Sequence, residues 1–95
     1  MKEKKIGWAS FLKLCHHSTS IKQCDAIFHL LFTAEERDQL ADRVLLVREL
    51  LKGEKTQRQI AADLNISIAK ITRGSNQLKE TNEDVKQHFL NAIDH

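Results

Sequence analysis

The chain has 95 residues, a formal net charge of +2 at pH 7, two cysteines and no proline. Its length predicts a single domain over residues 1–95, too small to be very stable without a staple or a partner. The composition excludes a disulfide-rich secreted domain and a membrane-spanning protein, because cysteines are few and no apolar stretch could cross a bilayer. Ser10 and Lys13 also interrupt the apolar stretch that a signal peptide would need. We therefore expect a cytoplasmic protein with reduced thiols and no membrane partner.

The first 32 residues show a helical pattern that is hard to bury within one small chain. Four residues share one face of the first helix: Trp8, Phe11, Leu12 and Cys15. The sequence HHSTS then interrupts the helix. The pattern resumes over Ala26–Phe32, which is apolar around nearly its whole circumference, and this predicts deep burial. We interpret residues 1–32 as dimerisation helices, and the alternative is an ordinary monomeric core.

Residues 33–53 predict a long core helix with clear start and stop signals. Thr33 and Glu36 form a capping box, in which each side chain binds the other residue's backbone N–H group. Gly53 ends the helix, since glycine adopts positive φ at little cost. The apolar face between these signals contains Leu40, Val44, Val47 and Leu51.

Residues 56–80 predict a helix-turn-helix, the unit in which a second helix lies in the DNA major groove. Thr56 and Gln59 form a second capping box, Asn65 suits the left-handed turn, and Ser67 caps the second helix. In the first helix, the side chains expected to face the core are Ile60, Ala61 and Leu64. In the second helix, they are Ile68, Ile71 and Leu78.

Residues 82–93 predict a C-terminal packing helix that begins at a cap around Thr81 and Asn82. Its apolar side chains are Val85, Phe89, Ala92 and Ile93. The whole chain is therefore expected to be all-α, with about six short helices. Its charge is uneven, with four basic residues against one acidic residue in 56–79 and one against four in 80–95. A positive middle and a negative tail suit a protein that presents one face to phosphate.

The segment from residue 37 to 79 closely resembles the bacterial Trp repressor family. The short sequence segments that it shares with the family are Glu36-Arg37, Arg43-Val44, Glu49–Leu51, Gly53-Glu54, Gln57-Arg58, ITRGSN at Ile71–Asn76, and Leu78-Lys79. The likeness is strong over residues 28–80 and extends more weakly to Trp8, Phe11 and the helix at 85–89. It implies an intertwined homodimer that binds double-stranded operator DNA as a transcriptional repressor. L-tryptophan would be the corepressor, and the regulated genes would serve tryptophan biosynthesis or uptake.

The resemblance implies a ligand site whose residue types fit an amino acid zwitterion. Arg43 and Arg73 match the family by identity, and a guanidinium can pair with a carboxylate while its plane stacks on an indole. Thr33 would add a hydroxyl group, and carbonyls near Leu30 and Phe32 would accept from the ammonium group. Val47 and Gly74 would supply an apolar wall and clearance. Without the resemblance, Arg43 would be assigned to an ion pair on a charged helix face.

Two residues of this site depart from well-known family members. Gln77 stands where those members have a serine near the ligand amine, and Phe32 replaces a smaller aliphatic residue. Gln77 is long enough to bind the ammonium group or to crowd it. A related aromatic metabolite therefore remains an alternative ligand.

The implied DNA site lies at the start of each helix of the helix-turn-helix. Arg58 suits a bidentate bond with guanine, although it could equally be a surface arginine on a capped helix. Base edges or bridging waters would meet Ile68, Ala69, Lys70 and Thr72. Phosphate contacts are assigned to Gln57, Asn76 and Lys79. Lys70 replaces a threonine of the family and Ala61 replaces a lysine, so sequence preference and phosphate contacts could differ.

Other classes of function explain less of the sequence. A helix-turn-helix protein that binds DNA without a ligand, or with another ligand, is the main alternative, and a protein-interaction bundle is a third. No nucleophile–base pair or phosphate loop is evident, so we expect no enzymatic role. The cysteines and histidines that could suggest a zinc site are Cys15, His16, His17, Cys24 and His29. Their spacing matches no standard zinc pair, so we expect no metal. We also expect no cofactor, since L-tryptophan would be a corepressor ligand.

Overall fold

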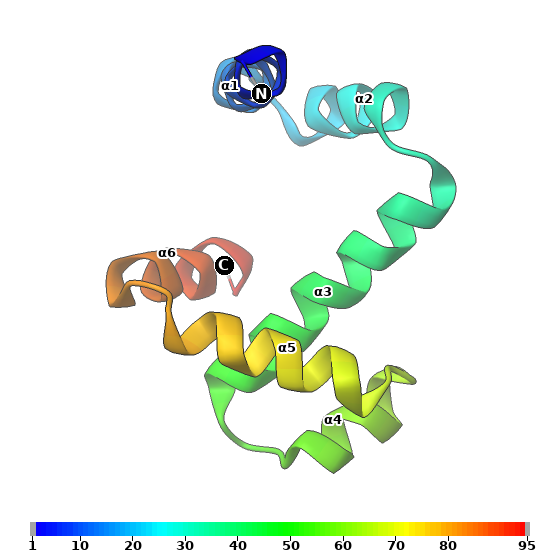
Figure 1. The fold of residues 1–95 in the computed structure, drawn as a ribbon, viewed down its shortest axis with the longest axis vertical. Helices are drawn as coiled ribbons and strands as arrows, with labels where there is room; N and C mark the ends of the chain where they lie inside the picture. Colours follow the sequence, from blue (N-terminus) through cyan, green and yellow to red (C-terminus); the bar gives the residue numbers. More distant parts are fainter. Residues whose placement is uncertain (1, 95) are drawn as a thin grey trace. The chain divides into compact units, whose positions relative to one another are not determined.

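A computed structural model describes residues 2–94, which form six helices and contain no strand (Figure 1). The helices are α1 (Lys2–His17), α2 (Ile21–Leu31), α3 (Ala34–Lys52), α4 (Gln57–Leu64), α5 (Ile68–Lys79) and α6 (Glu83–Ile93). The predicted all-α class with six short helices is confirmed. The chain divides into two compact units, Met1–Arg37 and Asp38–His95, and α3 runs from the first into the second.

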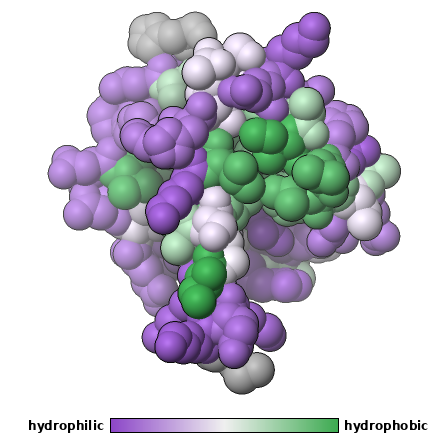
Figure 2. Space-filling model, turned by 90° about the horizontal axis from the view of Figure 1, so that it is seen from above, coloured by the Kyte–Doolittle hydropathy of each residue, from purple (hydrophilic) through white to green (hydrophobic). Residues whose placement is uncertain are grey.

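The described residues of the N-terminal unit, 2–37, contain an aromatic cluster but no fully buried residue. The ring of Phe11 lies 5.9 Å from that of Phe28 and 6.0 Å from that of Phe32, measured between centroids. Neither α1 nor α2 buries a side chain completely, and Leu30 is 82% exposed. The expected deep burial of Ala26–Phe32 is therefore wrong for the single chain. Apolar side chains reach the molecular surface among hydrophilic ones, as Figure 2 shows.

The second helix begins five residues before the expected Ala26, because its cap lies earlier. Ser20 caps α2 by accepting a hydrogen bond from the backbone N–H of Gln23 at 3.1 Å. The side chain of Gln23 accepts in return from the backbone N–H of Thr19 at 2.7 Å. This local exchange starts a helix at Ile21, directly after the segment HHSTS that was expected to interrupt the helix.

The predicted start and stop of α3 are confirmed in detail. The backbone N–H of Glu36 donates to the Thr33 hydroxyl at 3.1 Å, and the backbone N–H of Thr33 donates to the Glu36 carboxylate at 2.9 Å. Gly53 follows the helix with φ of +68°. Only glycine adopts this left-handed conformation without a steric penalty, so the chain can turn sharply toward α4.

The C-terminal unit is organised around a small aliphatic core shared by α3, α4 and α5. Its fully buried members are Ile60 and Ile71, joined by Leu46 at 3% and Ile66 at 7% exposure. In Figure 1, α5 crosses α3 while α4 lies against α5. The two helices lie close together at Gly74, where an added Cβ would lie 3.2 Å from the Cδ2 atom of Leu46. The small residue therefore allows α5 to pack closely on α3.

The connection between α4 and α5 has the predicted turn chemistry. Thr56 and Gln59 form the full capping box of α4, and Asn65 ends that helix with φ of 53° and ψ of 47°. The Ser67 hydroxyl then accepts from the backbone N–H of Lys70 at 3.3 Å and caps α5. Similarly, Asn82 caps α6 by accepting from the backbone N–H of Asp84 at 2.8 Å.

One inward-facing residue of α5 was predicted incorrectly. Ile68 is 47% exposed, whereas Ile71 is fully buried and Leu78 is half-buried. The turn residue Ile66 is buried beside Ile71 in the same cluster, and Ile68 at the first position of α5 is left outside it. In α6, Phe89 and Ile93 are half-buried, while Val85 is 56% exposed and Ala92 is exposed.

A salt bridge fixes the loop before α4 to both flanking helices. The Lys55 ammonium lies 2.8 Å from the Asp63 carboxylate on α4 and 3.8 Å from that of Glu49 on α3. The hydrogen bond that Lys55 donates to Asp63 raises the pKa of Lys55 above its ordinary value, and the charges of Asp63 and Glu49 act in the same direction. The lysine therefore helps to orient α4 relative to the end of α3.

Candidate ligand pocket and nucleic-acid interface

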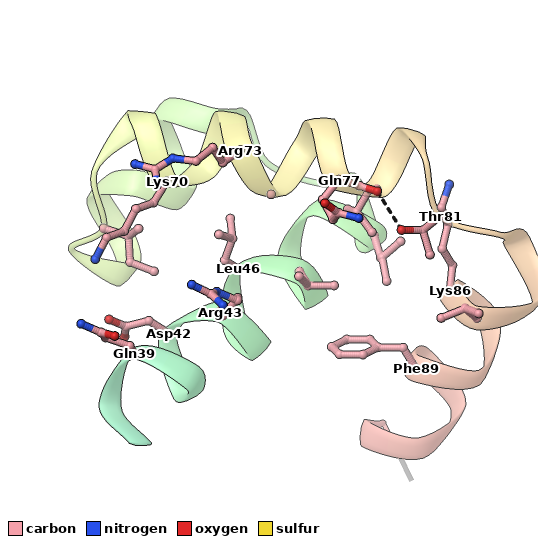
Figure 3. A pocket seen from close by; sticks show the side chains of 16 residues that line it. Gln39, Asp42, Arg43, Leu46, Lys70, Arg73, Gln77, Thr81, Lys86 and Phe89 are labelled. Carbon is pink, nitrogen blue, oxygen red and sulfur yellow. Dashed lines mark hydrogen bonds between the residues drawn. The ribbon is translucent and has the colours of Figure 1, made fainter. Parts of the chain in front are cut away.

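A cavity of about 590 Å³ lies within the C-terminal unit, between α3, α5 and α6 (Figure 3). Its lining residues come from three helices and from the connections before α5 and α6. They are Gln39, Asp42, Arg43, Leu46, Val47, Leu51, Ile66, Lys70, Arg73, Gly74, Gln77, Leu78, Thr81, Val85, Lys86 and Phe89. The volume lies within the range of small-molecule sites, and the mixture of aliphatic walls with a few polar groups is typical of them.

The two ends of the cavity differ in chemistry. In Figure 3, Gln39, Asp42, Arg43, Lys70 and Arg73 gather toward one end. Toward the other end the figure shows Gln77, Thr81, Lys86 and Phe89. The first end therefore contains three cationic side chains and one carboxylate. The second offers an aromatic ring, neutral hydrogen-bonding groups and Lys86, whose ammonium group is paired with Glu83.

Five of the eight predicted ligand residues line this cavity: Arg43, Val47, Arg73, Gly74 and Gln77. Among residues 2–94, neither Arg43 nor Arg73 forms an ion pair, and both are exposed. The alternative assignment of Arg43 to an ion pair along its own helix therefore has no counterpart in the described residues. Both guanidinium groups are available to an anion that enters the cavity.

The other three predicted ligand residues, Leu30, Phe32 and Thr33, belong to the N-terminal unit and do not line the cavity. Two of them have local roles there. The Phe32 carbonyl accepts a hydrogen bond from the Arg37 guanidinium at 2.7 Å, and the Thr33 hydroxyl accepts from the backbone of Glu36. The Phe32 carbonyl, expected to accept from a ligand ammonium, thus already has a cationic donor.

Gly74 has a role that the sequence did not reveal. Clearance for a ligand was the expected reason for a glycine, yet the added Cβ would meet Leu46 at 3.2 Å and Leu50 at 3.6 Å. The residue therefore also sets the distance between α5 and α3, two of the three helices that form the cavity walls. A larger residue would change the width of the cavity even without touching a ligand.

All eight predicted DNA-contacting residues are exposed: Gln57, Arg58, Ile68, Ala69, Lys70, Thr72, Asn76 and Lys79. Their positions on α5 do not all share one face, because successive residues turn by about 100° around a helix. Ile68, Thr72, Asn76 and Lys79 follow the helical repeat along one side. Lys70 instead shares its side with Arg73, Gly74 and Gln77, all of which line the cavity.

The main lining residues missed from the sequence are Asp42, Leu46, Lys70 and Phe89. Helical spacing was the available signal for three of them. Asp42 and Leu46 lie next to Arg43 and Val47 on α3, and Lys70 lies one turn before Arg73 and Gly74 on α5. Phe89 had no such signal, because its place depends on how α6 turns back toward α3.

The described part of the chain contains no group of three or more metal-binding side chains placed to hold an ion. Cys15 and Cys24 are free thiols, and both are half-buried. Within the same residues, no helix is both long and apolar enough to cross a membrane.

The chain belongs to the Trp repressor protein family, a family of transcription regulators whose model matches residues 6–93. It is similar to the Trp operon repressor homolog of Vibrio vulnificus, with 48% identity over 92% of this chain and 85% of that protein. It is also similar to the homolog of the same name from Chlamydia trachomatis serovar D, with 41% identity over 96% and 97% of the two chains. The homolog from Vibrio cholerae is 44% identical over 83% of this chain and 77% of its own length.

Proposed function

We propose that this protein is a homodimeric, sequence-specific DNA-binding repressor that L-tryptophan activates as corepressor, and that it controls genes of tryptophan biosynthesis or uptake. One observation carries the proposal. Arg43 on α3 and Arg73 on α5 line one cavity without ion-pair partners among residues 2–94, while another side of α5 exposes residues suited to DNA. Membership of the Trp repressor family and similarity to proteins named Trp operon repressor homologs support the same assignment.

The cavity chemistry suits an aromatic amino acid. A carboxylate would pair with Arg43 or Arg73, because charge-assisted bonds to guanidinium groups are strong and directional. An indole ring would lie against the guanidinium planes and the aliphatic walls, and each such contact contributes about 0.5–2 kcal/mol. Gln77 lines the same cavity one helical turn after Arg73, so its amide oxygen would accept from the ammonium group, which is bonded to the same carbon as the carboxylate.

The helix pair α4–α5 would act as the helix-turn-helix. Its second helix, α5, presents Ile68, Thr72 and Asn76 along an exposed side, where they would meet the major groove. Arg58 at the start of α4 is exposed and suits a guanine. Lys79 and Gln57 would position the unit through phosphate contacts, which set register more than sequence.

The exposed apolar side chains of the N-terminal unit support the proposed dimer. Trp8 is 63% exposed, Leu12 49% and Ile21 90%, although a soluble chain gains free energy by burying such side chains. A second copy of the chain would cover them and would place two α5 helices about 34 Å apart, the spacing of successive major grooves on one face of DNA. The operator is then expected to be near-palindromic.

Ligand binding would control operator binding by a shift of population. The ligand would touch the side of α5 formed by Arg73, Gly74 and Gln77 and would hold that helix at a fixed angle to α3. A coupling of about 1–3 kcal/mol between ligand and operator corresponds to a change of about 5- to 150-fold in operator affinity.

The test is operator binding with and without ligand. Duplexes selected from a random pool in the presence of L-tryptophan would be titrated with the protein, with fluorescence anisotropy as the readout. We expect saturating L-tryptophan to tighten binding within the stated range, and rising salt to weaken it steeply as phosphate contacts are lost. Equal affinity with and without L-tryptophan, together with a steep salt dependence, would favour the alternative of a ligand-independent DNA-binding protein.

A further inference from the structure

We propose that Lys70, which the sequence assigned to DNA, is a specificity residue of the ligand cavity and selects ligands that bear a carboxylate. This inference deepens the proposed function and rests on it. Lys70 lines the cavity together with Arg43 and Arg73, and Figure 3 shows its side chain directed from α5 toward the part of α3 that carries Gln39 and Asp42.

The helical position of Lys70 supports this assignment. It precedes Arg73 by three residues, Gly74 by four and Gln77 by seven, which is the spacing of one side of a helix. All four residues line the cavity. Thr72 and Asn76 are exposed, as Lys70 is, but they do not line the cavity. Lys70 therefore lies on the ligand side of α5, away from the side formed by Thr72 and Asn76.

The charges around the cavity give Lys70 a definite role. Lys86 is the fourth cation of the lining, and it is paired with Glu83 at 3.1 Å. Among residues 2–94, Arg43, Lys70 and Arg73 form no ion pair, and Asp42 is the lone carboxylate of the lining. This end of the cavity thus has an excess of positive charge that an anionic ligand would neutralise.

Asp42 sets the opposite preference at the same end. Its half-buried carboxylate repels a ligand carboxylate and attracts a ligand ammonium group, whereas Lys70 does the reverse. Together the two residues favour a ligand that presents both charges, and among such ligands the net positive charge favours the carboxylate as the group held most tightly. An aromatic amine that lacks a carboxylate should bind poorly.

The experiment compares three ligands on the full chain by calorimetry: L-tryptophan, indole-3-acetate, which lacks the amine, and tryptamine, which lacks the carboxylate. Lys70→Met keeps a long, helix-compatible side chain and removes the charge. We expect it to weaken the binding of L-tryptophan and indole-3-acetate by about 3- to 10-fold. The affinity for tryptamine should be unchanged or slightly higher. Asp42→Asn should tighten the binding of L-tryptophan and indole-3-acetate by about 2- to 5-fold and weaken the binding of tryptamine.

Lys52→Met is the matched control, because Lys52 lies on α3, is exposed and does not line the cavity. It should leave all three affinities unchanged, and circular dichroism of each variant should match the wild type. If Lys70→Met alters operator binding but no ligand affinity, the residue serves DNA and the inference is overturned.

The outcome for wild type separates this inference from the proposed function. If indole-3-acetate binds with the expected dependence on Lys70 and L-tryptophan does not bind, the choice of corepressor is wrong while the role of Lys70 stands. If no ligand with a carboxylate binds the wild-type protein, both are overturned.

Discussion

The two units of this chain bury their apolar side chains to very different extents. In the C-terminal unit, Ile60 and Ile71 are fully buried and Leu46 nearly so. In the N-terminal unit, α1 and α2 bury no residue completely, and Leu30 and Ile21 are 82% and 90% exposed. The C-terminal unit thus has a core of its own, whereas α1 and α2 leave large apolar side chains exposed, which the proposed dimer would cover.

Disruption of the proposed dimer should have the largest effect. Leu12→Lys places a charge on the apolar face of α1, and in a symmetric dimer the change occurs twice. Because burial of a leucine contributes about 1.5–3 kcal/mol, we expect the dimer dissociation constant to rise by about 100-fold or more. Sedimentation velocity at several protein concentrations measures this change.

The neighbouring exposed lysine supplies the control for that experiment. Lys13→Met removes a charge from the same helix and should leave the dimer intact. A wild-type protein that sediments as a monomer at all concentrations would contradict the account of the N-terminal unit.

The next largest effect should come from the core of the C-terminal unit. Ile71→Ala removes a fully buried side chain and should lower the free energy of unfolding by about 2–5 kcal/mol. The loss should be similar at low and high protein concentration, because this core lies within one chain. Denaturant titration followed by circular dichroism would measure it, and a loss below about 1 kcal/mol would show that the core is more tolerant than its burial implies.

A smaller and more specific effect is expected at the cavity. Arg43→Ala should weaken L-tryptophan binding by about 10- to 150-fold, since hydrogen bonds to charged groups contribute about 1.5–3 kcal/mol. The helix content should not change, because Arg43 is exposed and unpaired among residues 2–94. Calorimetry and circular dichroism measure the two quantities.

Arg58→Ala is the matched variant for that prediction. It removes an arginine from the exposed start of α4, so it should weaken operator binding and preserve ligand binding. A loss of helix content in Arg43→Ala would instead assign Arg43 to the stability of α3.

The smallest effect should be the pH dependence of Lys55. Its pKa is raised in the folded protein, chiefly by the hydrogen bond with Asp63, so the stabilisation is fully present below its ordinary pKa of 10.5. It is lost as pH rises through the higher pKa of the folded state. The melting temperatures of wild type and Lys55→Met should differ slightly at pH 7 and converge above pH 10.5.

Lys52→Met, at the exposed end of α3, should show no such convergence. High salt should reduce the difference in melting temperature between wild type and Lys55→Met, because the ammonium group is near the surface and its ion pairs are screened. A difference that persists unchanged at high pH would assign the effect to packing of the lysine stem.

Features that depend on a few neighbouring residues could be predicted from the sequence. The capping boxes at Thr33 and Thr56, the positive φ at Gly53 and Asn65, and the cap at Ser67 all follow from short-range chemistry. The prediction failed where tertiary packing decides. The exposure of Ile68, the burial of Ile66 and the place of Lys70 depend on how α5 lies against α3 and α4.

The candidate site was predictable in part for the same reason. Arg43, Arg73 and Gln77 were identified through the family resemblance, and the structure places them around one cavity. Leu30 and Phe32 lie in the other unit, and their contribution would depend on assembly of the dimer. Family membership thus supplied residue roles that helical periodicity alone did not indicate.

The central claim is that one helix, α5, couples ligand binding to operator binding, and reciprocity tests it most directly. The affinity for L-tryptophan would be measured by calorimetry with the protein alone and with the protein saturated by its selected operator. The account predicts that operator tightens L-tryptophan binding by the same factor, about 5- to 150-fold, by which L-tryptophan tightens operator binding. An L-tryptophan affinity that is identical with and without operator would contradict it.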